Sequence, residues 1–207
     1  SSIKGQFIYS KPNFAYTDNT LNTSLASTTT DNLTDFGYKV SETGFSVGTD
    51  FEQYENFFFS PSLSISLEDL ETNSTASTNL KKQEGNYSDF YFKYGLNYDL
   101  RNSKYMTSSG NRTIFYQELP LVSDGNEILN SISFDQFQKL SKNSDMVGKA
   151  SFYFKAINSV DPDKDVRVSK RANVPYSRLR GFERGKIGPV DNKDYVGGNY
   201  VSSVSYT

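Results

Sequence analysis

Apolar and polar residues alternate along much of this chain, most clearly in the stretch FFFSPSLSISLEDL. One face would carry Phe57, Phe59, Pro61, Leu63, Ile65 and Leu67, and the other Phe58, Ser60, Ser62, Ser64, Ser66 and Glu68. In a β-strand, successive side chains point to opposite faces, so strict alternation is the signature of a strand with two different surroundings. The stretch therefore predicts one long strand with an apolar and a polar side.

The same period recurs along the chain. DFYFKYGLNYDL and GKASFYFKA repeat it clearly, and weaker versions run through Ile3–Tyr9, Leu21–Ser27, Tyr38–Phe51, Thr113–Leu121, Ile128–Leu140 and from Asn199 onward. Together they predict about nine consecutive strands, several of them longer than the five or six residues usual in globular proteins. About ten residues, tilted by roughly 45°, are enough to cross a bilayer.

The connections between these strands differ in length. KPN and EQYEN are short, whereas residues 68–88 and 158–198 are long and polar, and short turns opposite long loops are typical of outer-membrane barrels. A soluble β-sandwich is the alternative, but its inward faces favour Val, Ile and Leu. Here an aromatic and aliphatic face opposes one of Ser, Lys, Asn and Asp. The pattern favours an all-β, antiparallel, up-and-down transmembrane β-barrel.

Composition narrows the possible functions. The chain has no Cys and no His, so thiolate chemistry, disulfides and the commonest general base are excluded. The net charge of −2 gives no general attraction for nucleic acid. We expect no enzymatic activity, no catalytic residue and no cofactor, with a secreted hydrolase using Asp and Glu as the weakest alternative.

The long segment 158–198 is rich in charge. It could be a solvated external loop, and its glycines match neither a phosphate-binding loop nor a dinucleotide fingerprint. Asp161, Asp163 and Asp165 resemble half of a calcium loop, but the central Gly and distal Glu are missing, so we predict no metal site.

Three short motifs inside and after this segment occur in a fixed order: LRGF at Leu179–Phe182, IGP at Ile187–Pro189, and VGGN at Val196–Asn199. This order resembles the signature of the outer-membrane protein assembly factor family, in its C-terminal bacterial surface antigen barrel. YDLRNSKYMTSSGNR, residues 98–112, resembles a periplasmic turn of that family, and YSKPNF at Tyr9–Phe14 resembles an earlier turn.

The resemblance covers nearly the whole chain and implies a piece of a barrel of about sixteen strands. It implies barrel strands over residues 1–157, a loop folding into the lumen over 158–198, and the start of the next strand over 199–207. The periplasmic POTRA domains and the terminal strands would lie outside this piece, and the sheet is expected to be open and curved.

The resemblance also implies roles for single residues. Arg180 would point into the lumen, paired with acids on strands outside this piece or with Asp99, Asp135 or Glu118. Leu179 and Ile187 complete the motifs. In the rest of the loop, Gly181 would allow a tight turn, Phe182 would pack against the inner wall, and Gly188 and Pro189 would fix the returning turn. The last strand would start at Gly197, Gly198 and Asn199. The periplasmic turn would be formed by Asp99, Arg101, Asn102 and Gly110. The lead-in ANVPYS, residues 172–177, departs from the family pattern of an aromatic residue followed by two glycines.

The implied function is the insertion and folding of outer-membrane proteins in a Gram-negative bacterium. The implied partners are the lipid bilayer of the outer membrane, unfolded outer-membrane protein clients and accessory lipoproteins of the assembly machinery. The implied mechanism uses a gate between the first and last barrel strands, both outside this piece. A related secretion transporter, a TamA-like assembly factor and a passive channel remain as alternatives.

Overall fold

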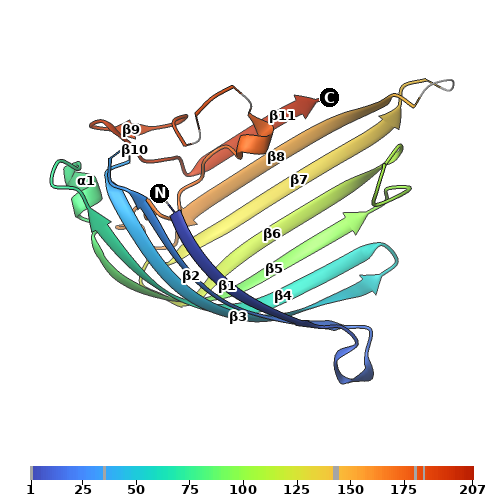
Figure 1. Ribbon diagram of the computed structural model, residues 1–207, viewed down its shortest axis with the longest axis horizontal. Helices are drawn as coiled ribbons and strands as arrows, with labels where there is room; N and C mark the ends of the chain where they lie inside the picture. The colour runs from blue at the N-terminus through green and yellow to red at the C-terminus, as the bar shows by residue number, and fades with distance from the viewer. Residues whose placement is uncertain (1, 35, 142–144, 180, 184) are drawn as a thin grey trace.

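The computed structural model describes residues 2–34, 36–141, 145–179, 181–183 and 185–207. One antiparallel sheet of nine strands dominates it, in the order β1-β2-β3-β4-β5-β6-β7-β8-β11 (Figure 1). The strands are β1 (Ser2–Lys11), β2 (Thr20–Asn32), β3 (Tyr38–Tyr54), β4 (Phe57–Thr72), β5 (Gly85–Asp99), β6 (Gly110–Ser123), β7 (Glu127–Lys139), β8 (Val147–Ser159) and β11 (Tyr200–Tyr206). The nine strands predicted from the alternation are confirmed.

The sheet is open and curved, as predicted. Each of the first eight strands pairs with its neighbour in the chain, and β11 joins the edge of β8 after the long loop. Strands β1 and β11 stand at the two ends of the order, without a ladder joining them in the described part of the chain. Figure 1 shows the sheet bent into a trough, with the loop between β8 and β11 lying on its hollow side.

The outer face of the trough carries the apolar side chains. Phe7, Leu25, Phe45, Ile65 and Phe90 lie side by side in register from β1 to β5. Ile65 is 52% exposed and Leu25 is 51% exposed. A sandwich would cover such a row with a second large sheet, whereas the described residues form only a two-stranded sheet besides the nine strands. This face therefore suits contact with lipid.

The height of the apolar face fits a bilayer. On β4 it runs from Phe57 to Leu67, about 33 Å along the strand, which a tilt of about 40° reduces to a height of about 25 Å. Aromatic rings gather at the end of this band where β3 turns into β4, which we call the turn end of the sheet. The ring centroids of Phe51 and Phe59 lie 5.6 Å apart there, and those of Phe57 and Tyr98 lie 6.4 Å apart. Such rings are typical of the girdle at a membrane–water interface.

The connections follow the predicted rule only in part. At one end of the sheet, residues 73–84 and 160–199 form long connections, but 33–37 and 124–126 are short. At the other end, 12–19 and 100–109 are of intermediate length. The connection 73–84 contains the short helix α1 (Thr78–Lys81), and the last loop contains the two-stranded hairpin of β9 (Val190–Asp191) and β10 (Asp194–Tyr195). Within the described ranges, no helix is long and apolar enough to cross a membrane.

The buried core is small and lies at the loop end of the sheet. One cluster consists of Leu70, Ala76, Leu80, Val168 and Val196, and the other of Ile157, Val166 and Ala172. Both combine strand residues with residues of the long loop. The loop is therefore packed onto the inner wall by apolar contacts as well as by charge.

Candidate functional site

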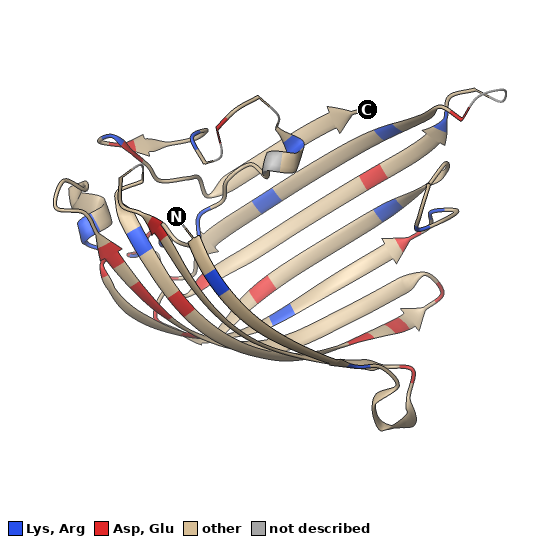
Figure 2. Cartoon of the chain, viewed as in Figure 1, with Lys and Arg blue, Asp and Glu red and all other residues tan. Residues whose placement is uncertain are grey.

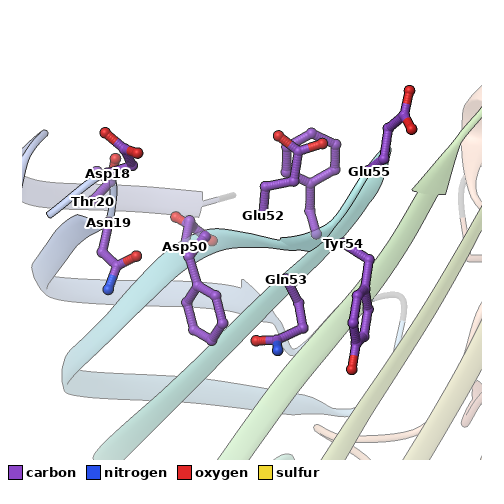
Figure 3. Close-up of a pocket in the computed structure, with 10 residues that line it drawn as sticks. Asp18, Asn19, Thr20, Asp50, Glu52, Gln53, Tyr54 and Glu55 are labelled. Carbon is purple, nitrogen blue, oxygen red and sulfur yellow. The ribbon is translucent and has the colours of Figure 1, made fainter.

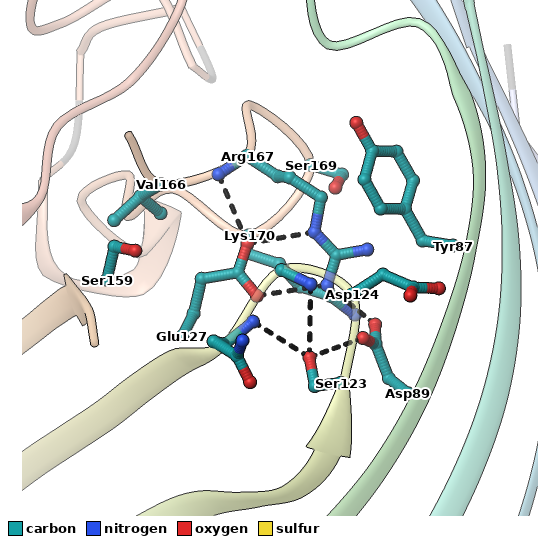
Figure 4. A network of polar contacts seen from close by, with 12 residues as sticks. Tyr87, Asp89, Ser123, Asp124, Glu127, Ser159, Val166, Arg167, Ser169 and Lys170 are labelled. Carbon is teal, nitrogen blue, oxygen red and sulfur yellow. Dashed lines mark hydrogen bonds and ion pairs between the residues drawn. The ribbon is translucent and has the colours of Figure 1, made fainter. Parts of the chain in front are cut away.

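The candidate site is centred on Arg167, a loop residue that is only 2% exposed (Figure 4). Its Nε donates to Glu127 Oε1 at 2.8 Å, and its Nη2 donates to Asp89 Oδ2 at 2.6 Å and to Glu127 Oε2 at 3.0 Å. Its Nη1 lies 3.7 Å from Glu68 Oε1. These carboxylates come from β4, β5 and β7, so a single guanidinium ties three strands to the loop.

The loop backbone around Arg167 is fixed in the same place. Val166 and Val168 flank it and are 0% and 4% exposed, one in each apolar cluster. The Arg167 amide donates to Glu127 Oε1 at 3.3 Å, and the Val168 amide donates to Gln83 Oε1 at 2.8 Å. Apolar residues on both sides therefore force the charged side chain between them into the wall, where only paired charges are tolerated.

The three carboxylates have further partners. The Tyr91 hydroxyl donates to Glu127 at 3.1 Å, Ser123 Oγ donates to Asp89 at 2.6 Å, and Ser169 Oγ donates to Glu68 at 2.6 Å. The Lys170 ammonium adds ion pairs of 3.5 Å with Glu68 and 3.4 Å with Glu42. The Arg167 guanidinium also lies over the Tyr87 ring, 4.4 Å from its centroid. The result is a connected polar network, the kind of arrangement that makes buried charge tolerable.

Charge and burial oppose each other at Arg167. Burial acts to lower the pKa of its guanidinium, but the hydrogen bonds and negative charges of Glu127, Glu68 and Asp89 outweigh that effect and raise the pKa further above its ordinary value. Arg167 is therefore permanently charged. Figure 2 shows acidic positions at the strand ends next to the loop. Glu68, Asp89 and Glu127 supply the negative charge that neutralises Arg167.

Sequence reasoning counted Arg167 only as one of many charges in a polar loop. Two signals could have found it. The triplet Val-Arg-Val puts an arginine between two β-branched apolar residues, and Glu68 and Asp89 interrupt the Ser-rich polar sides of their strands. The pairing itself joins residues 78 positions apart, for Arg167 and Asp89, and no local pattern reports such a pairing.

The residues of the predicted loop motif differ in conformation and exposure. Arg180 lies outside the described residues. Gly181 and Gly188 have φ angles of +86° and +129°, which suit their predicted places in turns. The Phe182 ring, predicted to pack against the inner wall, is 57% exposed. Its neighbours Gly181 and Glu183 are exposed as well.

The three acids considered as partners for Arg180 form ion pairs with other side chains. Asp99 pairs with Arg101 at 2.7 Å, Asp135 with Lys149 at 3.3 Å, and Glu118 with Lys93 at 3.5 Å. Leu179 and Ile187 are half-buried, and Pro189 accepts a backbone hydrogen bond of 3.2 Å from Val196.

The predicted strand-start motif closes the loop on itself. Gly198 and Ala172 form a two-way backbone bridge, with N···O distances of 3.0 and 2.7 Å. Gly197 has φ +71°, and a Cβ there would lie 3.2 Å from the Ala172 carbonyl oxygen. Asn199 accepts from the Ile157 amide at 2.8 Å, one residue before β11 begins. Gly197 is therefore favoured where the end of the loop passes Ala172.

The predicted turn at residues 99–110 is a compact unit. Arg101 donates to both oxygens of Asp99, at 2.8 and 2.7 Å. Asn102 Oδ1 accepts from the amides of Ser108 and Ser109, at 3.0 and 3.1 Å. Gly110 has φ +97°, and a Cβ there would lie 2.1 Å from the Leu100 carbonyl oxygen. The residues singled out by resemblance thus come together in one turn.

A hollow of about 830 Å³ lies beside the other turns at this end (Figure 3). Its lining includes Asp18, Asp50, Glu52 and Glu55, and Glu52 accepts from the Asn56 amide at 2.7 Å. In the ranges that the structure describes, no group of three or more acidic side chains is arranged to hold a metal ion.

Comparison with known proteins gives two findings. The family model described as the Omp85 superfamily domain matches residues 2–206. The crystal structure of BamA from Haemophilus ducreyi lacking POTRA domains 1–3 is similar, with a TM-score of 0.88 and 21% sequence identity. The match covers 99% of this chain and 44% of that one, so this chain spans less than half of the similar protein's length. Among curated protein sequences, none matches.

Proposed function

The chain belongs to the Omp85 superfamily, and we propose that it forms part of an outer-membrane barrel that inserts and folds outer-membrane proteins. The proposal is supported by the family match and by the likeness of its sheet to that of a BamA barrel. It also draws on the ordered Leu179–Phe182, Ile187–Pro189 and Val196–Asn199 motifs. Clients, accessory lipoproteins and the Gram-negative outer membrane are part of this proposal.

The membrane location is supported by the outer face of the sheet. Its apolar band is about 25 Å high, it is exposed over residues such as Ile65 and Leu67, and it ends in aromatic rings. Exposed apolar patches of this extent are unstable in water and need a partner. A bilayer is the partner whose thickness fits the band.

The observation that carries the proposal is the anchoring of the long loop inside the trough by Arg167. Strand templating by an assembly factor needs an exposed sheet edge held in a defined shape. A buried ion network joining β4, β5 and β7 to the loop stiffens the wall far from such an edge. In this view Arg167 does no chemistry and supports the barrel that presents the edge.

A passive channel is disfavoured by the same loop. Residues 166–172 lie on the inner wall and fill part of the trough, whereas a channel needs an open, water-filled lumen. A TamA-like assembly factor and a secretion transporter would share the fold. They differ from the proposed function in the client proteins that they act on.

The test uses the full-length protein reconstituted in lipid vesicles. An unfolded outer-membrane barrel and a soluble secreted protein are offered separately as clients. Faster folding of the barrel client into the membrane, relative to empty vesicles, is the expected result. Transport of the soluble client without faster barrel folding would overturn the proposal in favour of a secretion transporter, and a lack of effect on both would overturn it outright.

A further inference from the structure

A second loop arginine touches the inner wall at a different place. The Arg178 guanidinium lies over the Tyr153 ring, with its Cζ 4.8 Å from the ring centroid. Tyr153 stands on β8, on the inner side that also carries Ser151 and Lys155. Arg178 ends the short 3-10 turn Tyr176–Arg178, and its amide donates to Pro175 at 2.9 Å. The Leu179–Phe182 motif follows directly.

The wall around Tyr153 is built to leave its ring accessible. Its partners in register are Ser133 on β7 and Ser203 on β11, so a large ring stands between two small side chains. Cross-strand neighbours are close enough to cover a ring when they are large. Serines on both sides leave a face of the ring free for a guanidinium arriving from the loop.

The charge around Tyr153 explains why a ring, rather than a carboxylate, meets Arg178. Lys155 lies two residues further along the same inner face, and Asp135 of β7 is engaged by Lys149 at 3.3 Å and by Ser151. A guanidinium placed here would have the Lys155 ammonium nearby, and the Asp135 carboxylate is already paired. The ring quadrupole attracts a cation without adding a buried charge to the wall.

The two arginines fix different parts of the loop. Arg167 and the valines beside it hold the first part, up to the Ala172–Gly198 bridge. Beyond that bridge, Arg178 approaches the motif region and contacts the wall at Tyr153. Leu179, the first residue of the motif, is adjacent to Arg178, so the position at which the motif begins depends on where Arg178 rests.

We propose that Arg178 and Tyr153 are positioning residues, and that the Tyr153 ring is the seat that holds the backbone just before the LRGF motif over the inner face of β8. The inference rests on the proposed function only where it concerns activity, since an assembly factor would depend on a correctly placed motif. The contact between Arg178 and Tyr153 is tested independently of that activity. It lies in the part of the loop where the ANVPYS lead-in departs from the family pattern.

The experiment measures chymotrypsin cleavage after Phe182, which is exposed and is not altered by the substitutions. The full-length protein is folded in vesicles, and cleavage is followed by mass spectrometry in R178Q, Y153L and the double variant. Each single change is expected to raise the cleavage rate about three- to tenfold, the range that one cation–π contact supports. The double variant is expected to be no faster than the faster single variant, because both remove the same contact.

Conservative variants separate positioning from simple loss of structure. Y153F keeps the ring and is expected to be cleaved like the parent protein, and Y153W, with the ring that binds cations best, is expected to be cleaved at the same rate or more slowly. Y116L serves as the matched control, because Tyr116 also faces inward, on β6, and bonds to Glu118. Its cleavage after Phe182 should not change.

Several outcomes would overturn the seat: unchanged cleavage in R178Q, multiplied effects in the double variant, or Y153F behaving like Y153L. If Y153L fails to form a heat-resistant barrel, R178Q and Y153W still test the contact, because one changes the loop residue and the other the wall residue. Client insertion by the same proteins is scored separately. Coupled cleavage supports the seat whatever that second assay gives, and absent insertion by the parent protein counts only against the proposed function.

Discussion

Arginine–carboxylate pairs hold both ends of this sheet, but they do so in different ways. At the turn end, Arg101 grips Asp99, two residues away, and the side chains are 14% and 9% exposed. At the loop end, Arg167 and Asp89 are 78 positions apart, and their side chains are 3% and 0% exposed. The first pair shapes one turn. The second joins segments that are distant in the sequence, so its loss should lower the stability of the whole wall.

The largest effect is expected from R167M in the full-length protein. It would leave Glu68, Asp89 and Glu127 buried without their guanidinium, a kind of loss that costs about 3–5 kcal/mol. Urea unfolding of the barrel in vesicles, followed by heat-modifiability on gels, should show a much lower midpoint. K164Q is the control, because Lys164 is a loop cation that is 54% exposed. An unchanged midpoint in R167M would show that the network is not an anchor.

A smaller effect is expected at the turn from G110A. The new Cβ would meet the Leu100 carbonyl oxygen at 2.1 Å, and the backbone has φ +97°. Strain of this kind costs about 1–3 kcal/mol. The change should lower the unfolding midpoint less than R167M does. G5A is the matched control, because Gly5 sits in strand β1 with open space around its Cβ position. Equal midpoints for G110A and G5A would contradict the argument.

The smallest effect is expected from R101Q. A two-pronged pair close to water contributes about 1 kcal/mol, and salt weakens it. Raising the salt concentration from about 0.1 to 1 M shortens the screening length from about 10 to 3 Å. The stability difference between R101Q and the parent protein should therefore shrink in high salt, whereas that of R167M should persist. Equal salt dependence in both variants would mean that burial does not separate the two pairs.

The same contrast explains what could be predicted from sequence. Strands such as β4 follow from the period of their own side chains, and the turn from Asp99 to Gly110 follows from neighbours a few residues apart. The Arg167 network depends on where residues 68, 89 and 127 meet after folding, which no local pattern encodes. Phe182 shows that a motif does not fix the depth of its side chains, since an apolar ring predicted to pack on the wall is 57% exposed.

The Arg167 network also bears on the order of events during folding. A slip of one residue between two strands turns every side chain of the slipped strand to the opposite face. Arg167 can reach Glu68, Asp89 and Glu127 together only when β4, β5, β6 and β7 are all in register and the loop after β8 has been made. A one-residue slip of β4, β5 or β7 would turn its carboxylate to the lipid side and leave the guanidinium without that partner. The anchor thus works as a late check on the register of four strands.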